Sequence, residues 1–283
     1  MLLIFDPLFE LNLVNPYHSW EIIGFFFFLW GIAWLTLAIP IAWKLQWKPF
    51  EPFNLQQKLP LLAVLYLISP LIIWLFLQWL GMSWTDCGVD TAINFWVFLL
   101  FGLLIGLGSI LLTFMLEGWF GWLQWQRNNW EKLWPTSLKL LAGALTIGLA
   151  EETIFRGFLQ TLLEIDYSSV SAAILASIIF ALLHLIWGDD ATKPQLPGLW
   201  LMGMVLVFAR WVAGGNIGLA WGLHSAWLWG LWSLDAVNLF IYTDSGNAWL
   251  VGWKGQPLAG LAGIVCLGGT TTTLWLTSKL ILH

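Results

Sequence analysis

The sequence contains the stretch LAEETIFRG at residues 149–157. It places two adjacent carboxylates, Glu151 and Glu152, and one arginine, Arg156, inside a segment that is otherwise apolar enough to cross a membrane. A charged residue at the centre of a transmembrane helix costs about 2.5–3.5 kcal/mol, so such residues are rare there and mark functional sites. The stretch therefore predicts a membrane-spanning helix that carries an ionisable site.

The spacing within this stretch gives its two carboxylates different partners. Glu152 and Arg156 are four residues apart, about 40° around a helix, which is close enough to pair. Glu151 is turned about 140° from Arg156, so it has no partner within its own helix. We expect Arg156 to neutralise Glu152 and to leave Glu151 free as a base. The alternative is a purely architectural ion pair.

The composition excludes several classes of protein. Of 283 residues, 59% are hydrophobic and 10% are charged, whereas soluble domains carry about 25% charged residues. Apolar runs of twenty residues and more favour helices over an outer-membrane barrel. The net charge of −5 and the absence of a basic cluster indicate no nucleic-acid partner. Cys87 and Cys266 are too few and too far apart for a disulfide framework or a thiolate zinc site.

These observations predict an integral, multi-pass, all-α membrane protein, with about eight transmembrane helices in one bundle around an intramembrane polar site. Residues 1–21 contain three acidic residues and no basic one, so we expect no cleavable signal there. The predicted division of the chain is a non-membrane lead (1–21), N-terminal helices with an aromatic interfacial connection (22–137), a core that carries the polar site (138–240), and a loop with the last helix (241–283).

Eight segments are close to the roughly 20 residues that a bilayer requires. The predicted spans are Ile22–Trp43, Pro60–Leu80, Phe95–Met115, Leu138–Leu163, Val170–Trp187, Gly198–Val212, Ile217–Leu234 and Leu258–Leu282. The third contains Gly102 and Gly106 in a GxxxG pattern, which lets a neighbouring helix approach closely. In the fourth, Ala144 and Gly148 share one helical row with Glu152, so we expect Glu152 to face a packed helix rather than lipid.

Two features concern the ends of the spans. Lysine and arginine concentrate in the connections after spans one, three, five and seven, which predicts that both termini lie outside the cytoplasm. Arg210, near the end of the sixth span, is expected to extend toward an interface or to pair with Asp235. Asp189 and Asp190 are expected to form a solvated acidic turn.

His184 and His224 are the only histidines within the predicted spans, and both sit on or beside rows of small residues. Together with Glu151 they suit peptide hydrolysis. The carboxylate can take a proton from water, one imidazole can orient that water and protonate the leaving amine, and the other can donate to an oxyanion. Alternatively, these three residues could hold a metal ion with an open position. The residues alone leave both alternatives open.

Other hydrolase motifs are absent from the chain. No histidine is followed by glutamate, so the HExxH zinc motif is missing. There is no G-x-S-x-G nucleophile elbow, and neither cysteine has a positioned partner in the sequence.

Three motifs follow one another in an order that resembles the CAAX prenyl protease and bacteriocin-processing (CPBP) family. They are EExxFRG at residues 151–157, the pair Phe180 and His184 in FxxxH, and then His224. The resemblance covers about residues 138–240. It implies an eight-helix intramembrane peptidase whose substrate is a prenylated protein or a short hydrophobic peptide, with membrane lipid around it.

The resemblance also implies residue roles. Glu151 would activate water with His184, His224 would stabilise the oxyanion, and Glu152 with Arg156 would hold the site. Phe180 would form a wall of the substrate pocket, and Trp227 is a second candidate for substrate contact. Both a metalloprotease and a metal-free glutamate mechanism are attributed to the family, so Glu151, His184 and His224 are also the candidate ligands of a Zn²⁺ ion.

One residue departs from the family pattern. Many members carry HxxxN in the last motif, and the asparagine shares the oxyanion role, whereas here Leu228 stands four residues after His224. Leucine cannot donate a hydrogen bond. A second hypothesis is therefore a non-proteolytic membrane scaffold or maturation factor that retains the fold. A proton-coupled transporter is a third hypothesis, against which the lack of a two-half repeat counts.

Overall fold

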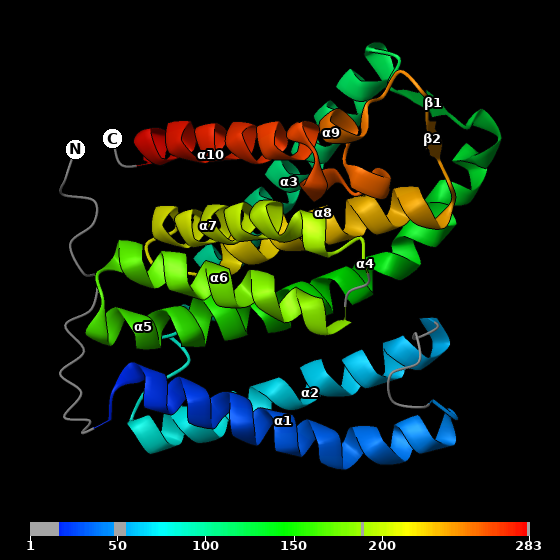
Figure 1. Ribbon diagram of the computed structural model, residues 1–283. Coiled ribbons are helices and arrows are strands. Elements are labelled where there is room, and N and C mark those ends of the chain that lie inside the picture. Colours follow the sequence, from blue (N-terminus) through cyan, green and yellow to red (C-terminus); the bar gives the residue numbers. More distant parts are fainter. Residues whose placement is uncertain (1–16, 48–54, 188–189, 282–283) are drawn as a thin grey trace.

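The computed structural model describes residues 17–47, 55–187 and 190–281 of the chain. Long helices run alternately up and down one bundle (Figure 1). Seven helices of the described residues are long and apolar enough to cross a membrane. The prediction of an all-α, multi-pass membrane bundle is thus confirmed. The main helices are α1 (Ser19–Lys44), α2 (Leu55–Leu80), α3 (Ile93–Trp119), α4 (Trp130–Glu152), α5 (Gln160–Asp166), α6 (Ser169–Trp187), α7 (Leu196–Val212), α8 (Gly218–Ala236) and α10 (Leu261–Ile281).

Helix α8 corresponds to the predicted seventh span but is not among the seven apolar helices. Its sequence contains three glycines, four tryptophans, a histidine and an aspartate, which lower its hydropathy. Residues 218–227 are all buried, because α3, α4 and α7 pack around the helix. A helix enclosed by protein needs less apolar surface than one that faces lipid. This explains why α8 lies within the bundle although it is less apolar than the seven other helices.

Glycine rows allow α3 and α8 to approach closely. A Cβ atom at Gly102 would lie 2.3 Å from the backbone oxygen of Leu219, and one at Gly222 would lie 2.2 Å from that of Leu99. Helix α4 approaches α8 from another side, where a Cβ atom at Gly148 would lie 2.4 Å from Ser225 Oγ. The close approach predicted from the GxxxG pattern and from the row that ends at Glu152 is confirmed.

The predicted fourth span is one long helical body in three parts. Helix α4 ends at Glu152, a π-helical segment covers Thr153–Leu159, and α5 completes the body to Asp166. All seven residues of the π-helical segment are buried. Short π-helical segments inside α-helices often occur at functional sites, and this one begins directly after the two glutamates. The sequence pattern did not predict it.

The connection after α3 contains structure that the sequence pattern did not indicate. Strand β1 (Leu123–Trp125) pairs antiparallel with β2 (Phe240–Tyr242), with Gln124 opposite Ile241. The pair ties the α3–α4 connection to the segment that follows α8. Short helices α9 (Ala248–Val251) and η4 (Trp253–Gly255) and η5 (Pro257–Ala259) then lead to α10.

Helices α1 and α2 form a hairpin along one side of the bundle (Figure 1). The hairpin contacts the long helical body near its π-helical segment, where the ring of Phe158 lies 4.9 Å from that of Phe26 and 5.9 Å from that of Phe76. Cys87, in the turn between α2 and α3, lies against Gly157 of the same segment. This arrangement brings α2 alongside the EExxFRG motif.

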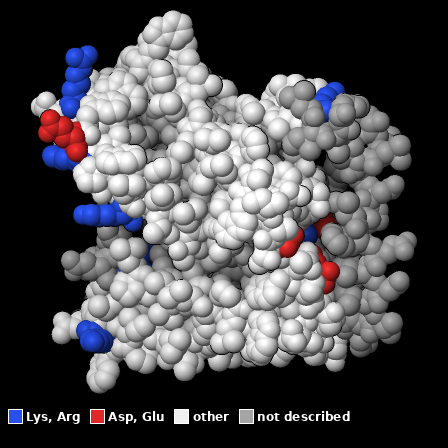
Figure 2. Space-filling view, turned by 180° about the vertical axis from the view of Figure 1, so that it is seen from behind, with Lys and Arg blue, Asp and Glu red and all other residues white. Residues whose placement is uncertain are grey.

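Charged side chains are sparse over the face seen in Figure 2, where most Lys and Arg atoms gather along one edge. Arg210 does not extend to such an edge, so this expectation was wrong. Its guanidinium is buried and donates from Nη2 to Thr161 Oγ1 at 2.8 Å and from Nε to the Gly215 carbonyl at 3.1 Å. Its charge partner is Glu164, 4.0 Å away, rather than Asp235. The reason is that the end of α7 faces the long helical body instead of lipid. Asp189 lies outside the described residues.

Candidate active site

The two glutamates of the EExxFRG motif lie at the end of α4, and Arg156 follows in the π-helical segment. Arg156 Nη1 donates to Glu152 Oε1 at 3.1 Å, and both side chains are buried. Arg156 Nη2 also reaches the Gly203 carbonyl of α7 at 3.4 Å. The predicted pairing of Glu152 with Arg156 is present, and it ties α4 to α7.

His224 of α8 lies between the two glutamates and directs one ring nitrogen to each. Nδ1 donates to Glu152 Oε1 at 2.7 Å, and Nε2 lies 3.6 Å from Glu151 Oε2. The imidazole is almost completely buried. Because a carboxylate only accepts hydrogen bonds, Glu152 fixes the N–H at Nδ1 and turns Nε2 toward Glu151. The sequence predicted that these residues would meet, but not that Glu152 would orient His224.

Tyr66 of α2 is a site residue that the sequence interpretation missed. Its hydroxyl donates a hydrogen bond to Glu151 Oε1. We had expected Glu151 to be free. It is not free, because it has partners on two other helices. One signal could have indicated Tyr66: it is the only residue with a phenol in the second span, and a phenol within a membrane usually finds a polar partner.

Phe180 and His184 of α6 form the next layer of the site. Phe180 is fully buried, and its ring centroid lies 4.6 Å from that of His184 and 6.0 Å from that of His224. Arg156 Cζ lies 4.2 Å from the same ring centroid, within cation–π distance. Phe180 is thus a buried side chain beside both histidines and Arg156, and it does not face lipid.

His184 is the more exposed of the two span histidines. Its Nδ1 lies 2.8 Å from the Phe180 carbonyl. Because a carbonyl oxygen only accepts, Nδ1 carries the hydrogen and Nε2 keeps a lone pair for another group. Among the described residues, no hydrogen bond or ion pair joins His184 to Glu151, so a water molecule and substrate atoms would have to join the two.

Three further residues bear on the predicted chemistry. Trp227 donates its indole N–H to Ser109 Oγ of α3 at 3.0 Å, so its role in substrate contact stays a prediction. Leu228 is half-buried one turn after His224 and offers no donor. Burial raises the pKa of the Cys87 thiol to about 12, which keeps it protonated at neutral pH and unsuited to nucleophilic catalysis.

Glu151, His184 and His224 are the candidate ligands of a metal ion. Within residues 17–47, 55–187 and 190–281, no group of three or more His, Cys, Asp or Glu side chains lies in a metal-binding arrangement. Glu151 and His224 are neighbours, but in the described part of the chain no hydrogen bond or ion pair joins His184 to either of them. As they lie, these side chains do not fit a three-ligand zinc site. The zinc alternative stays a prediction.

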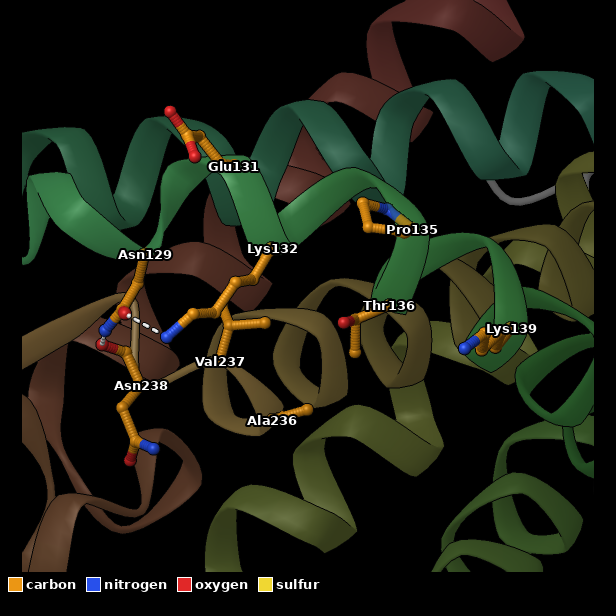
Figure 3. A pocket seen from close by; sticks show the side chains of 9 residues that line it. All are labelled: Asn129, Glu131, Lys132, Pro135, Thr136, Lys139, Ala236, Val237 and Asn238. Atoms are coloured by element: carbon orange, nitrogen blue, oxygen red, sulfur yellow. Dashed lines mark hydrogen bonds between the residues drawn. The ribbon is translucent and has the colours of Figure 1, made fainter.

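A cavity of about 690 Å³ lies elsewhere, between the first turns of α4 and the end of α8 (Figure 3). None of the candidate catalytic residues lines it. The cavity is therefore separate from the Glu151 site. Its lining consists of Asn129, Glu131, Lys132, Pro135, Thr136, Lys139, Ala236, Val237 and Asn238.

Comparison with known proteins gives one match. Residues 132–230 match the family model described as type II CAAX prenyl endopeptidase Rce1-like. The matched range contains all three motifs and both span histidines, and it agrees with the resemblance found in the sequence. No curated protein and no solved structure matches the chain.

Proposed function

Because residues 132–230 carry an Rce1-like domain, which belongs to a membrane protease family, we propose that this chain is an intramembrane endopeptidase in which Glu151 activates the attacking water. The single observation that carries the proposal is the position of Glu151. Its carboxylate is held by Tyr66 of α2 and lies 3.6 Å from His224 of α8. A carboxylate with donors fixed around it inside a mostly apolar bundle is a suitable base for water.

The first step of the proposed reaction takes place at Glu151. A water molecule bound to this carboxylate gives its proton to Glu151 while its oxygen attacks the carbonyl carbon of the peptide bond. His184 Nε2 retains a lone pair, because Nδ1 donates to the Phe180 carbonyl, and can accept a second hydrogen bond from the same water. This would fix the direction of attack.

The second step expels the amine. When the tetrahedral intermediate collapses, the carbon–nitrogen bond breaks and the nitrogen takes a proton from Glu151 or through His184. His224, held at Nδ1 by Glu152, is proposed to carry a hydrogen on Nε2 as well, so that the protonated ring donates from Nε2 to the developing oxyanion. Glu152 and Arg156 are proposed to act by holding this geometry rather than by touching the substrate.

The proposed substrate is a prenylated protein or a hydrophobic peptide, cleaved near the membrane surface. The family description supplies the prenyl CAAX class. Apolar side chains on the outside of the bundle, such as Leu182 and Ile186 of α6, would keep such a lipid-bearing substrate within reach of the site. The bond cleaved and the lipid carried are part of the proposal.

The test is peptide cleavage by the purified full chain in detergent, with a fluorogenic farnesylated CAAX peptide. Wild type should cleave it, and Glu151→Gln should lower kcat by about 10²- to 10⁴-fold, the usual contribution of a general base. His184→Ala should also lower kcat. The matched control is Glu131→Gln, which changes an exposed glutamate in the first turn of the same helix. Equal rates for wild type, Glu151→Gln and His184→Ala would refute the proposal.

A second candidate function is a membrane scaffold that has kept the fold without turnover. Leu228 favours it, because the position that offers an amide donor in many relatives offers none here. In that case Glu151→Gln would leave the cellular phenotype intact at normal protein level. A phenotype that disappears with Glu151→Gln would favour the peptidase.

A further inference from the structure

The hydroxyl of Tyr66 takes no part in the steps proposed for Glu151, His184 and His224. It comes from α2, outside residues 132–230, and donates to Glu151 Oε1. Meanwhile the proposed mechanism has only one donor, His224, for the oxyanion of the tetrahedral intermediate, because Leu228 cannot donate. The Tyr66 hydroxyl is thus a hydrogen-bond donor without a part in the proposed steps, and the oxyanion lacks a second donor.

The two donors converge on the same carboxylate. Tyr66 Oη contacts Glu151 Oε1, and His224 Nε2 lies 3.6 Å from Glu151 Oε2. The attacking water must also contact this carboxylate. The carbonyl group that it attacks therefore lies next to Glu151 in the proposed complex. A carbonyl oxygen placed there lies within reach of both the phenol and the imidazole, which is the geometric requirement for an oxyanion site.

Charge movement during the reaction provides the reason for the hydroxyl to change partner. In the resting site, the strongest acceptor near Tyr66 is the Glu151 carboxylate. When Glu151 takes the proton of the attacking water, it becomes neutral, and the negative charge moves to the former carbonyl oxygen. Hydrogen bonds to a charged acceptor are about twice as strong as those between neutral groups. Rotation about the Cζ–Oη bond then lets the O–H follow the charge.

We infer that Tyr66 is a catalytic residue that donates a hydrogen bond to the oxyanion, in place of the amide that Leu228 does not supply. This inference rests on the proposed function. Tyr66 keeps its own proton throughout: the water oxygen bonds to the carbonyl carbon, the water proton goes to Glu151, and the O–H only changes its acceptor. When the carbon–nitrogen bond breaks, the carbonyl reforms and the hydroxyl returns to the Glu151 carboxylate.

The experiment compares wild type with Tyr66→Phe, which removes the hydroxyl and keeps the aromatic ring. With the farnesylated peptide, kcat should fall by about 10²-fold while KM changes less than threefold, because the lost interaction forms only in the transition state. Binding of a phosphinate peptide, which mimics the tetrahedral intermediate, should weaken by a similar factor. Binding of the uncleaved peptide to an inactive Glu151→Gln background should be unchanged by Tyr66→Phe.

The matched control is Tyr167→Phe. The Tyr167 hydroxyl accepts a hydrogen bond from Trp20 Nε1 at 2.7 Å at the surface, away from Glu151, so kcat should match wild type. A Tyr66→Phe variant with wild-type kcat would overturn the assignment while leaving the peptidase intact. Equal loss of affinity for the peptide and for the phosphinate would also overturn it, since that result indicates a structural role. An inactive wild type would overturn the proposed function and this assignment with it.

Discussion

Glu152 and His224 join α4 to α8 through a hydrogen bond of 2.7 Å between Oε1 and Nδ1. The same carboxylate oxygen accepts from Arg156 at 3.1 Å. One buried oxygen therefore holds a guanidinium and an imidazole that come from different elements. Consequently, the ion pair of Glu152 and Arg156 that the sequence predicts also orients the imidazole of His224, a proposed catalytic residue.

The Glu152–Arg156 pair should be important for stability because both charges are buried. Glu152→Leu leaves Arg156 without its charge partner, and removal of one member of a buried pair typically costs about 3–5 kcal/mol. We expect thermal unfolding in detergent at a clearly lower temperature. Replacing both residues by leucine should restore part of the loss, since no unpaired charge then remains.

The control for this experiment is the surface pair of Lys193 and Asp190, whose atoms lie 3.3 Å apart and whose side chains are largely exposed. Asp190→Asn should change stability by less than about 1 kcal/mol. A similar unfolding temperature for Glu152→Leu and Asp190→Asn would show that burial of the inner pair has no energetic consequence.

The contact between α3 and α8 predicts a difference between two glycines. A Cβ atom at Gly222 would meet backbone oxygen at 2.2 Å, whereas one at Gly108 of α3 would meet nothing within 4 Å. Gly222→Ala should therefore separate the helices and destabilise the bundle by about 1–3 kcal/mol or more. Gly108→Ala should be neutral or slightly stabilising, because alanine favours helix. Unfolding temperatures of the two variants provide the measurement, and equal values would contradict the close approach.

Arg210 should contribute to stability without contributing to catalysis. Its guanidinium binds Thr161 and the Gly215 carbonyl in a fork that lysine cannot reproduce. Arg210→Lys should lower the unfolding temperature, by an amount that corresponds to about 1–3 kcal/mol for buried polar groups left unpaired. At a temperature where the variant stays folded, its kcat should equal that of wild type. A selective loss of kcat in a stable Arg210→Lys protein would place Arg210 in the reaction.

The local spacing of residues was sufficient to predict the parts of the site that lie on one helix. The i,i+4 pair of Glu152 and Arg156 and the small-residue row through Gly148 follow from helical geometry, and both are present. The contact of Tyr66 with Glu151 joins residues 85 positions apart, and no periodicity encodes it. The π-helical segment was also not predicted, because all seven of its residues are buried and no surface periodicity marks the change in helix type.

The sequence also contains little information about helix α8 and about the strand pair β1–β2. Helix α8 is less apolar than its neighbours because it is enclosed by them, a property of the assembled bundle. Strands β1 and β2 have three residues each and pair across more than a hundred positions, so neither has enough alternation to be recognised. The sequence therefore predicts which elements exist better than it predicts which of them become neighbours.

The position of Leu228 offers a direct test of the role inferred for Tyr66. It lies one helical turn after His224, so Leu228→Asn would place an amide donor on the same face of α8. If Tyr66 already supplies the second oxyanion donor, the amide should change kcat little in wild type. In the Tyr66→Phe background, it should raise kcat about tenfold or more, because one donor is worth about 10²-fold and the new amide regains part of that factor. Leu228→Met, similar in volume but without a donor, is the control. An equal effect of Leu228→Asn in both backgrounds would mean that the two groups act independently and do not share one oxyanion.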